Sequence, residues 1–187
     1  MKSALDEIEE TSEVVLDASV VINLLGTGVA KKILTAFEFK CAIDKLAVQE
    51  IVRHPRPDGD LKKELGLLVR EGLIREVKLS DARYKDFLEL VGAPSPDGLG
   101  DGEAATLVQA VSLRAVAVID ERKAKRIAAA RYSSLKIVST VDILFHASII
   151  LRLGESNVAA AITDARRYAR MPISKECLAW LMREVPR

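Results

Sequence analysis

Four acidic side chains, far apart in the sequence, have the types and positions expected of a metal site. Asp17 and Asp120 each follow a short apolar run, as a residue at the end of a buried strand does. Glu50 and Glu103 lie in line with apolar residues one helical turn away, which places each on the inward face of a predicted helix. Carboxylates gathered together raise one another's pKa, and a bound dication removes that penalty. The four residues therefore predict an acidic, cation-binding site.

The chemistry that such a site supports is hydrolysis of a phosphate ester. Mg²⁺ and Mn²⁺ prefer hard oxygen ligands and often bind through a few carboxylates together with substrate phosphate. A cation held in this way makes water acidic enough to attack phosphorus. The two histidines, His54 and His146, are too few for a histidine-rich zinc site, and His146 is expected to pack in the core.

Each acid also has a purely structural explanation. Asp17 and Asp120 could cap the helices that follow them, and Glu50 could pair with Arg53 or His54 on the surface. The four acids together are harder to explain in this way than any one of them. Spacing alone therefore supports an acidic site in an α/β domain and nothing narrower.

Asp101 stands two residues before Glu103 and is the least clear of the acids. Its position before a predicted helix favours a capping role. It could instead share the metal site with Glu103 or replace it there.

Apolar runs and helical stripes alternate along the chain. Strands are expected at 14–16, 39–43, 74–79, 115–119 and 136–138. Helices are expected at 19–25, 29–37, 44–53, 61–71, 80–91, 102–114, 121–132, 141–151, 155–168 and 174–183. This alternation predicts a three-layer α/β/α fold whose parallel sheet has helices on both faces, with sites at the carboxyl ends of the strands.

Composition and charge exclude several classes of protein. The 28 basic and 27 acidic residues give a net charge of +1, and the basic ones cluster, so a polyanion is neither required nor excluded. No apolar run is long enough for a membrane helix, and the acidic start, residues 1–13, does not resemble a secretory signal. Two distant cysteines, Cys41 and Cys177, fit small buried residues in a reducing compartment. A cytoplasmic protein that binds no membrane is expected.

Four segments together resemble the PIN-domain family of nucleases. Residues 15–25 are similar to its opening strand and helix, in which an Asp is followed two residues later by Ser, Thr or Asn. Residues 46–52, 102–110 and 117–124 resemble its second, third and fourth acidic segments. The order and spacing agree over roughly residues 13–146.

This resemblance implies a five-stranded parallel sheet and an Mg²⁺- or Mn²⁺-dependent endoribonuclease activity on RNA. It also implies frequent homodimers and, for VapC-like members, a toxin neutralised by a cognate antitoxin. By position, the implied metal ligands are Asp17, Glu50, Glu103 and Asp120, with Asp101 able to share; Ser19 and Asn23 assist; and Arg53, Arg122 and Lys123 are candidates to hold the RNA backbone.

The end of the chain departs from the family pattern. Residues 1–150 are expected to form the PIN-like domain and 151–187 a C-terminal helical extension packed on the same domain. The extension has two apolar helical stripes, formed by Val158, Ala161, Ile162 and Ala165 and by Ile173, Cys177, Trp180 and Leu181. Packing on the domain's own core is favoured, and a dimer or antitoxin surface is the alternative.

Three other functions compete with the nuclease. A non-catalytic PIN-like binding or scaffold module would retain the fold without cleavage. A haloacid dehalogenase phosphatase needs a second Asp two residues after the first, where this chain has Ser19. A dinucleotide-binding loop is disfavoured because Gly26-Thr-Gly28 follows a helix and lacks a third glycine.

Overall fold

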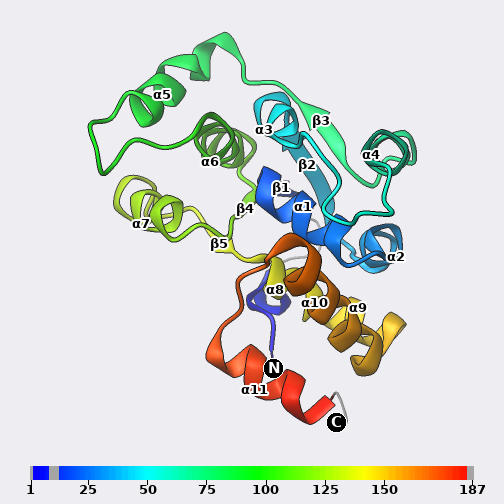
Figure 1. Cartoon of the computed structure of the whole chain (residues 1–187). Helices are drawn as coiled ribbons and strands as arrows, with labels where there is room; N and C mark the ends of the chain where they lie inside the picture. The colour runs from blue at the N-terminus through cyan, green and yellow to red at the C-terminus, as the bar shows by residue number, and fades with distance from the viewer. Residues whose placement is uncertain (1, 9–12, 185–187) are drawn as a thin grey trace.

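The computed structural model describes residues 2–8 and 13–184, and these form a parallel sheet covered by helices on both faces (Figure 1). The strands are β1 (Glu13–Leu16), β2 (Lys40–Asp44), β3 (Arg75–Val77), β4 (Val116–Val118) and β5 (Ile137–Val138). The helices are a 3₁₀ turn, η1 (Ala4–Glu7), and α1 (Ala18–Gly26), α2 (Ala30–Ala36), α3 (Lys45–Glu50), α4 (Leu61–Arg70), α5 (Asp81–Val91), α6 (Asp101–Leu113), α7 (Arg122–Arg131), α8 (Thr140–Leu144), α9 (Ala147–Leu153), α10 (Glu155–Ala169) and α11 (Lys175–Glu184). The predicted fold class, a five-stranded parallel sheet in a three-layer α/β/α arrangement, is confirmed.

The strand order, β3-β2-β1-β4-β5, decides where a site can form. The chain builds outward from β1 in one direction through β2 and β3, then returns to β4 on the other side of β1. At such a reversal the connecting helices diverge to opposite faces and leave a crevice at the carboxyl ends of the two central strands. Leu16 of β1 is level with Val118 of β4, so whatever follows these residues meets at the crevice.

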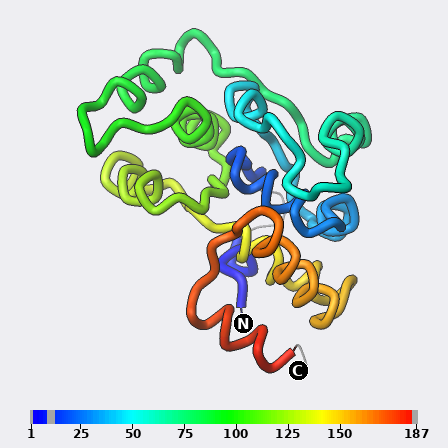
Figure 2. Tube along the Cα trace, in the orientation of Figure 1, coloured from blue at the N-terminus to red at the C-terminus, as the bar shows by residue number. Residues whose placement is uncertain are grey.

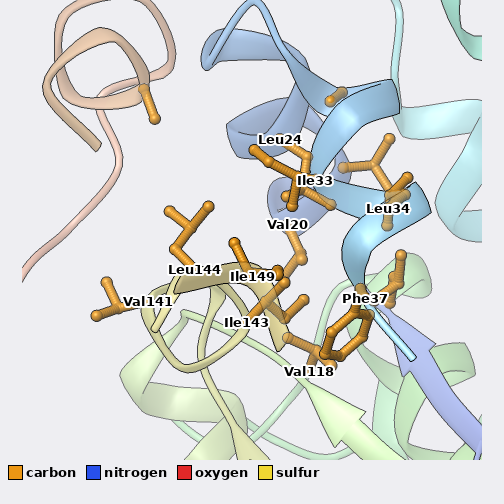
Figure 3. Close-up of a cluster of buried hydrophobic side chains, with 14 of the residues drawn as sticks. Val20, Leu24, Ile33, Leu34, Phe37, Val118, Val141, Ile143, Leu144 and Ile149 are labelled. Carbon is orange, nitrogen blue, oxygen red and sulfur yellow. The ribbon is translucent and has the colours of Figure 1, made fainter. Parts of the chain in front are cut away.

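The sheet is buried on both faces because successive side chains of each strand point to opposite sides. Val14 and Leu16 belong to the core under α1, α2 and the C-terminal helices, whereas Val15 belongs to the core under α5, α6 and α7. Figure 3 shows the first core, in which Val20 and Leu24 of α1 gather with side chains from α2, α8 and α9. Two separate apolar cores, one on each face, thus hold the sheet in place.

The C-terminal segment packs against this first core, and the chain trace in Figure 2 shows α10 lying beside α1 (orange on blue). Both predicted stripes of the segment contribute buried side chains, including Ile162, Cys177 and Trp180. The Trp180 ring meets Phe145 edge to face, with 4.6 Å between ring centroids. The stripes are therefore core-facing, as the favoured interpretation predicted.

Two predicted helices were too long. The helix expected at 141–151 is two helices, because the side chain of His146 accepts a hydrogen bond from the Ser148 N–H and begins α9. His146 is buried, as expected, with its ring edge-on to those of Phe37 and Phe39. The helix expected to reach Arg53 ends at Glu50, because buried Ile51 leaves helical geometry to enter the core.

Gly26 allows α1 and α10 to approach closely. A Cβ atom built there would lie 2.7 Å from the Cβ of Ala169 and 3.4 Å from the Cα of Ala165. We expect Gly26→Ala to destabilise the domain by about 1–3 kcal/mol, the usual cost of overpacking a core, as measured by urea denaturation. Gly66→Ala in α4 is the matched control, because its Cβ would meet only the flexible end of Arg70. The control should be neutral or stabilising by up to about 1 kcal/mol, and equal losses in both variants would contradict the assigned contact.

Within the described residues, no single helix is both long and apolar enough to cross a membrane. Only α1 and α2 taken together, which meet at a bend of 111°, reach that length and composition.

Candidate active site

A pocket of about 410 Å³ opens at the carboxyl ends of β1 and β4, in the crevice that the strand order creates. Its lining includes six of the residues singled out from the sequence: Asp17, Ser19, Asn23, Glu50, Glu103 and Asp120. Glu121 also lines it, an acid that the sequence analysis included only as part of a motif. We call this the acidic pocket.

Asp17 follows β1 directly, and its backbone N–H extends the sheet by donating to the Val118 carbonyl at 3.1 Å. One carboxylate oxygen, Oδ2, caps α1 by accepting from the Ser19 N–H and hydroxyl at 3.2 and 2.5 Å. The other oxygen, Oδ1, is buried without a hydrogen-bond partner in the described residues. Asp17, which lines the pocket, is therefore both a helix cap and the bearer of a buried acceptor without a partner in the described residues.

Asp120 is held by three donors from two helices. The Thr140 hydroxyl and N–H donate at 2.5 and 2.9 Å, and the Asn23 side-chain amide donates at 2.7 Å. Asp120 does not cap α7, since Glu121 does so by accepting from the Lys123 N–H. Helix capping, the purely structural explanation, is therefore correct for Asp17 and wrong for Asp120.

Glu50 is more exposed than its predicted place on an apolar stripe implied. It is the last residue of α3, and its carboxylate accepts from the Gly102 N–H at 2.7 Å. It forms no ion pair with Arg53 or His54, the surface partners considered from the sequence; His54 instead faces Glu64 at 3.3 Å. Gly102 thereby ties α3 to the start of α6.

Glu103 lies half-buried in the first turn of α6, as expected, and its carboxylate accepts from the Gly100 N–H at 3.1 Å. The N-cap of α6 is Gly100 and not Asp101, and the backbone N–H of Gly100 is satisfied by the Glu103 side chain. Asp101 is exposed and is not part of the pocket lining. Of the two neighbouring acids, the structure brings only Glu103 into the pocket.

Burial raises the pKa of both Asp17 and Glu103. For Asp17 the largest cause is loss of water, opposed by the Ser19 hydrogen bonds and reinforced by the charge of Asp120. For Glu103 burial again dominates, with the Asp17 charge adding to it. Each carboxylate would therefore gain from a nearby positive charge.

The three basic residues proposed for backbone binding are placed differently. Arg53 lines a second groove that adjoins the acidic pocket at Glu50. Lys123 donates to the Gly98 carbonyl at 2.9 Å. Its charge partly opposes the rise in the pKa of Glu103 that burial causes. Arg122 is exposed and lines neither the acidic pocket nor the adjoining groove.

The residues fit a hard dication in kind, although they do not form a closed cluster. The pocket gathers carboxylate oxygens, one of them buried and unpartnered, and oxygen donors of this type suit Mg²⁺ and Mn²⁺. In residues 2–8 and 13–184, however, no three acidic, histidine or cysteine side chains are grouped closely enough to hold a metal ion as they stand. Asp120, Glu50 and Glu103 are instead engaged by protein donors.

Thr140 holds one of the site's carboxylates and was missed by the sequence analysis. It is fully buried, 20 residues after Asp120, and its hydroxyl is one of two groups that donate to the same carboxylate oxygen. If Asp120 is a ligand of a catalytic cation, Thr140→Val should raise the cation concentration for half-maximal activity about 10- to 100-fold, as is usual when a partner of a ligand is lost. Thr106→Val is the control, because the buried Thr106 hydroxyl has no hydrogen-bond partner among the described residues. Equal effects of the two variants on the metal dependence would remove the positioning role of Thr140.

A three-layer α/β domain with an acid-lined pocket at the switch point of its sheet belongs, by architecture, with the α/β proteins that bind ligands at this edge. The family model described as PIN domain matches residues 13–185. This chain belongs to the PIN-domain family, and the match includes the C-terminal segment as well as the four acidic segments. PIN domains are generally nucleases, so the chain has the fold of a hydrolase. No curated protein and no solved structure matches the chain.

Proposed function

We propose that this chain is an Mg²⁺- or Mn²⁺-dependent endoribonuclease whose active site is the acidic pocket. The observation that carries the proposal is the buried Asp17 Oδ1, an acceptor that has no partner in the described residues. Asp17 lines the pocket together with four further carboxylates. A buried acceptor left unpaired costs free energy, and it persists where a ligand satisfies it. The family membership adds nuclease chemistry to this geometry.

Asp17, Glu50, Glu103 and Asp120 would hold the cation, with the hydrogen-bond donors of the pocket setting their positions. Ser19 fixes one oxygen of Asp17, and Asn23 with Thr140 fixes Asp120. When bound, a divalent ion supplies an acidified water and offsets the charge that develops on the phosphate. The protein's own part is to orient the carboxylates, to align the phosphodiester for in-line attack, and to hold the backbone with cations at the rim, including Lys123 and Arg53.

Metal titration with a labelled RNA tests this proposal directly. We expect cleavage to be absent in EDTA, to appear with Mg²⁺ or Mn²⁺, and to produce internal cuts rather than single-nucleotide release. A matched single-stranded DNA distinguishes the proposed substrate from nucleic acid in general. If no metal restores cleavage of any RNA, the nuclease proposal fails.

A non-catalytic PIN-like binding module is the second candidate. The observation that favours it is the lack, in the described part of the chain, of a compact ligand group. All four acids already accept hydrogen bonds from the protein. Such a module would bind RNA or a protein in the pocket and show no metal-dependent cleavage. The same titration separates the two candidates.

The biological setting that the resemblance implies is also a proposal. A VapC-like toxin in the cytoplasm would be paired with an antitoxin that covers the acidic pocket, and it would form a homodimer. The buried, unpaired Cys41 and Cys177 suit a reducing compartment. Mass in solution tests the dimer, and co-purification with the product of a neighbouring reading frame that suppresses cleavage tests the antitoxin.

A further inference from the structure

A second groove continues from the acidic pocket, and Arg170 stands at the junction. This groove has a volume of about 490 Å³ and is lined by residues of the segment after α3 and of the end of α10. It shares Ile22, Glu50, Ala169 and Arg170 with the acidic pocket, so the two form one continuous depression. We call the second part the basic groove.

Charge changes sign along this depression. Among the described residues that line the acidic pocket, Arg170 is the one cation beside five carboxylates. In the basic groove Arg53 and Arg170 stand with a single carboxylate, that of Glu50. Neither arginine forms an ion pair within the part of the chain that the structure describes, whereas nearby Arg56 is neutralised by Asp164 at 2.9 Å. Two unpaired guanidinium groups thus lie just beyond the acids.

The backbone holds Arg170 at an unfavourable conformation. It ends α10 with φ 59° and ψ 33°, a left-handed geometry that usually carries glycine or asparagine. Its neighbours fix it in place, since Ala169 packs against Gly26 and Met171 is buried. An arginine brings no conformational benefit at this position, and strained residues of this kind concentrate at functional sites.

The basic groove is suited to a backbone and not to stacked bases. Its aromatic residue, Tyr168, already has the guanidinium of Arg56 over its ring, 4.4 Å from the centroid. Contacts by arginine to phosphate position a strand without reading its sequence. A single strand with one phosphate at the acids would place its next phosphates beside Arg170 and Arg53.

We propose that Arg170, assisted by Arg53, binds the phosphate adjacent to the reacting one, so that single-stranded RNA runs from the acidic pocket into the basic groove. This assignment rests on the proposed nuclease function. It gives the end of α10, for which the sequence analysis expected no contact with substrate, a part in holding the strand.

The chain offers a matched control, because Arg114 is the other non-glycine residue with positive φ in the described residues. It ends α6 at φ 53° and is exposed, away from both parts of the depression. Arg170→Gly and Arg114→Gly therefore remove the same charge and relieve the same backbone conformation. Only the first removes a cation from the proposed path of the strand.

Binding of a short fluorescein-labelled single-stranded RNA is measured by anisotropy over a series of salt concentrations, with Mg²⁺ and in the Asp17→Asn background to prevent cleavage. We expect Arg170→Gly to weaken binding about fivefold to tenfold at low salt and to reduce the slope of log affinity against log salt by about 0.7, the value for one phosphate contact on a single strand. Arg114→Gly should leave both unchanged, and Arg170→Lys should keep the slope. Melting temperatures of both glycine variants should not fall.

Two results would overturn the role of Arg170: equal weakening by the two glycine variants, or a lysine variant that binds as poorly as the glycine variant. Cleavage by the wild-type protein, measured separately, tells these failures apart from failure of the proposed function. If the wild-type protein cleaves RNA while the two glycine variants bind alike, only the assignment of Arg170 is wrong. If it neither binds nor cleaves RNA, both proposals are wrong.

Discussion

Asp17→Asn should lower metal-dependent RNA cleavage by at least about 1,000-fold, about 4 kcal/mol of transition-state stabilisation, while the domain stays folded. The reason is that the two carboxylate oxygens of Asp17 have different roles. Oδ2 caps α1 through Ser19, and asparagine caps a helix about as well as aspartate. The substitution therefore keeps the cap and removes the negative charge that would hold the cation. Initial rates on labelled RNA at saturating metal measure the loss.

The same variant has a second expected effect, on stability without metal. Because burial raises the pKa of Asp17, its folded form favours the proton, and the charged form costs stability as pH rises above the carboxyl group's ordinary range. A neutral side chain removes that cost. We therefore expect Asp17→Asn to melt in EDTA at a temperature no lower than the wild-type protein does at pH 7, and to lose the stabilisation that added Mg²⁺ gives the wild-type protein.

Asp81→Asn is the control for charge alone, since Asp81 is an exposed acid at the start of α5, outside the pocket lining. It should cleave RNA within about twofold of the wild-type rate, because surface substitutions of this kind have small effects. Undiminished cleavage by Asp17→Asn would rule out the proposed site. If Asp17→Asn instead unfolds, the cap of α1 depends on the charge of Asp17. Cleavage by Glu103→Gln would then be measured in its place.

Gly102→Ala should lower activity about 10- to 100-fold although it adds only a single methyl group. A Cβ at position 102 would lie 2.7 Å from the carboxylate carbon and both carboxylate oxygens of Glu50. The Gly102 N–H also donates to that carboxylate. The methyl group must therefore displace Glu50, and a misplacement of about 1 Å costs on the order of 100-fold in rate.

The measurement is the dependence of the cleavage rate on Mg²⁺ concentration, in which a displaced ligand raises the concentration for half-maximal rate. Adding Glu50→Asp to Gly102→Ala shortens the side chain by one methylene and should recover part of the loss. Gly66→Ala in α4, whose added methyl group would meet only the end of the Arg70 side chain, controls for the effect of alanine in a helix. If Gly102→Ala behaves as Gly66→Ala does, Glu50 does not depend on its contact with α6.

Local sequence patterns were sufficient to predict the sheet, its helices and the edge at which the candidate site lies. Apolar runs of three and five residues mark the two central strands, and Asp17 and Asp120 stand directly after them. The edge to which these acids belong therefore follows from the geometry of parallel strands. The helical stripes of the C-terminal segment likewise predicted its buried face. These features depend on residues that are neighbours in the chain, which is why the chain alone reveals them.

The partners of each acid, in contrast, became known only from the tertiary structure. Thr140 reaches Asp120 across 20 residues, and Gly102 reaches Glu50 across 52. Arg170 reaches the pocket from the C-terminal segment, which was expected to pack on the core and not to line the site. The exposure of Glu50 and the exclusion of Asp101 from the pocket lining were decided in the same way, by how α3 and α6 meet. Periodicity states which face of an element is buried. It does not state which residue of another element that face will touch, because that depends on packing between segments that the sequence keeps far apart.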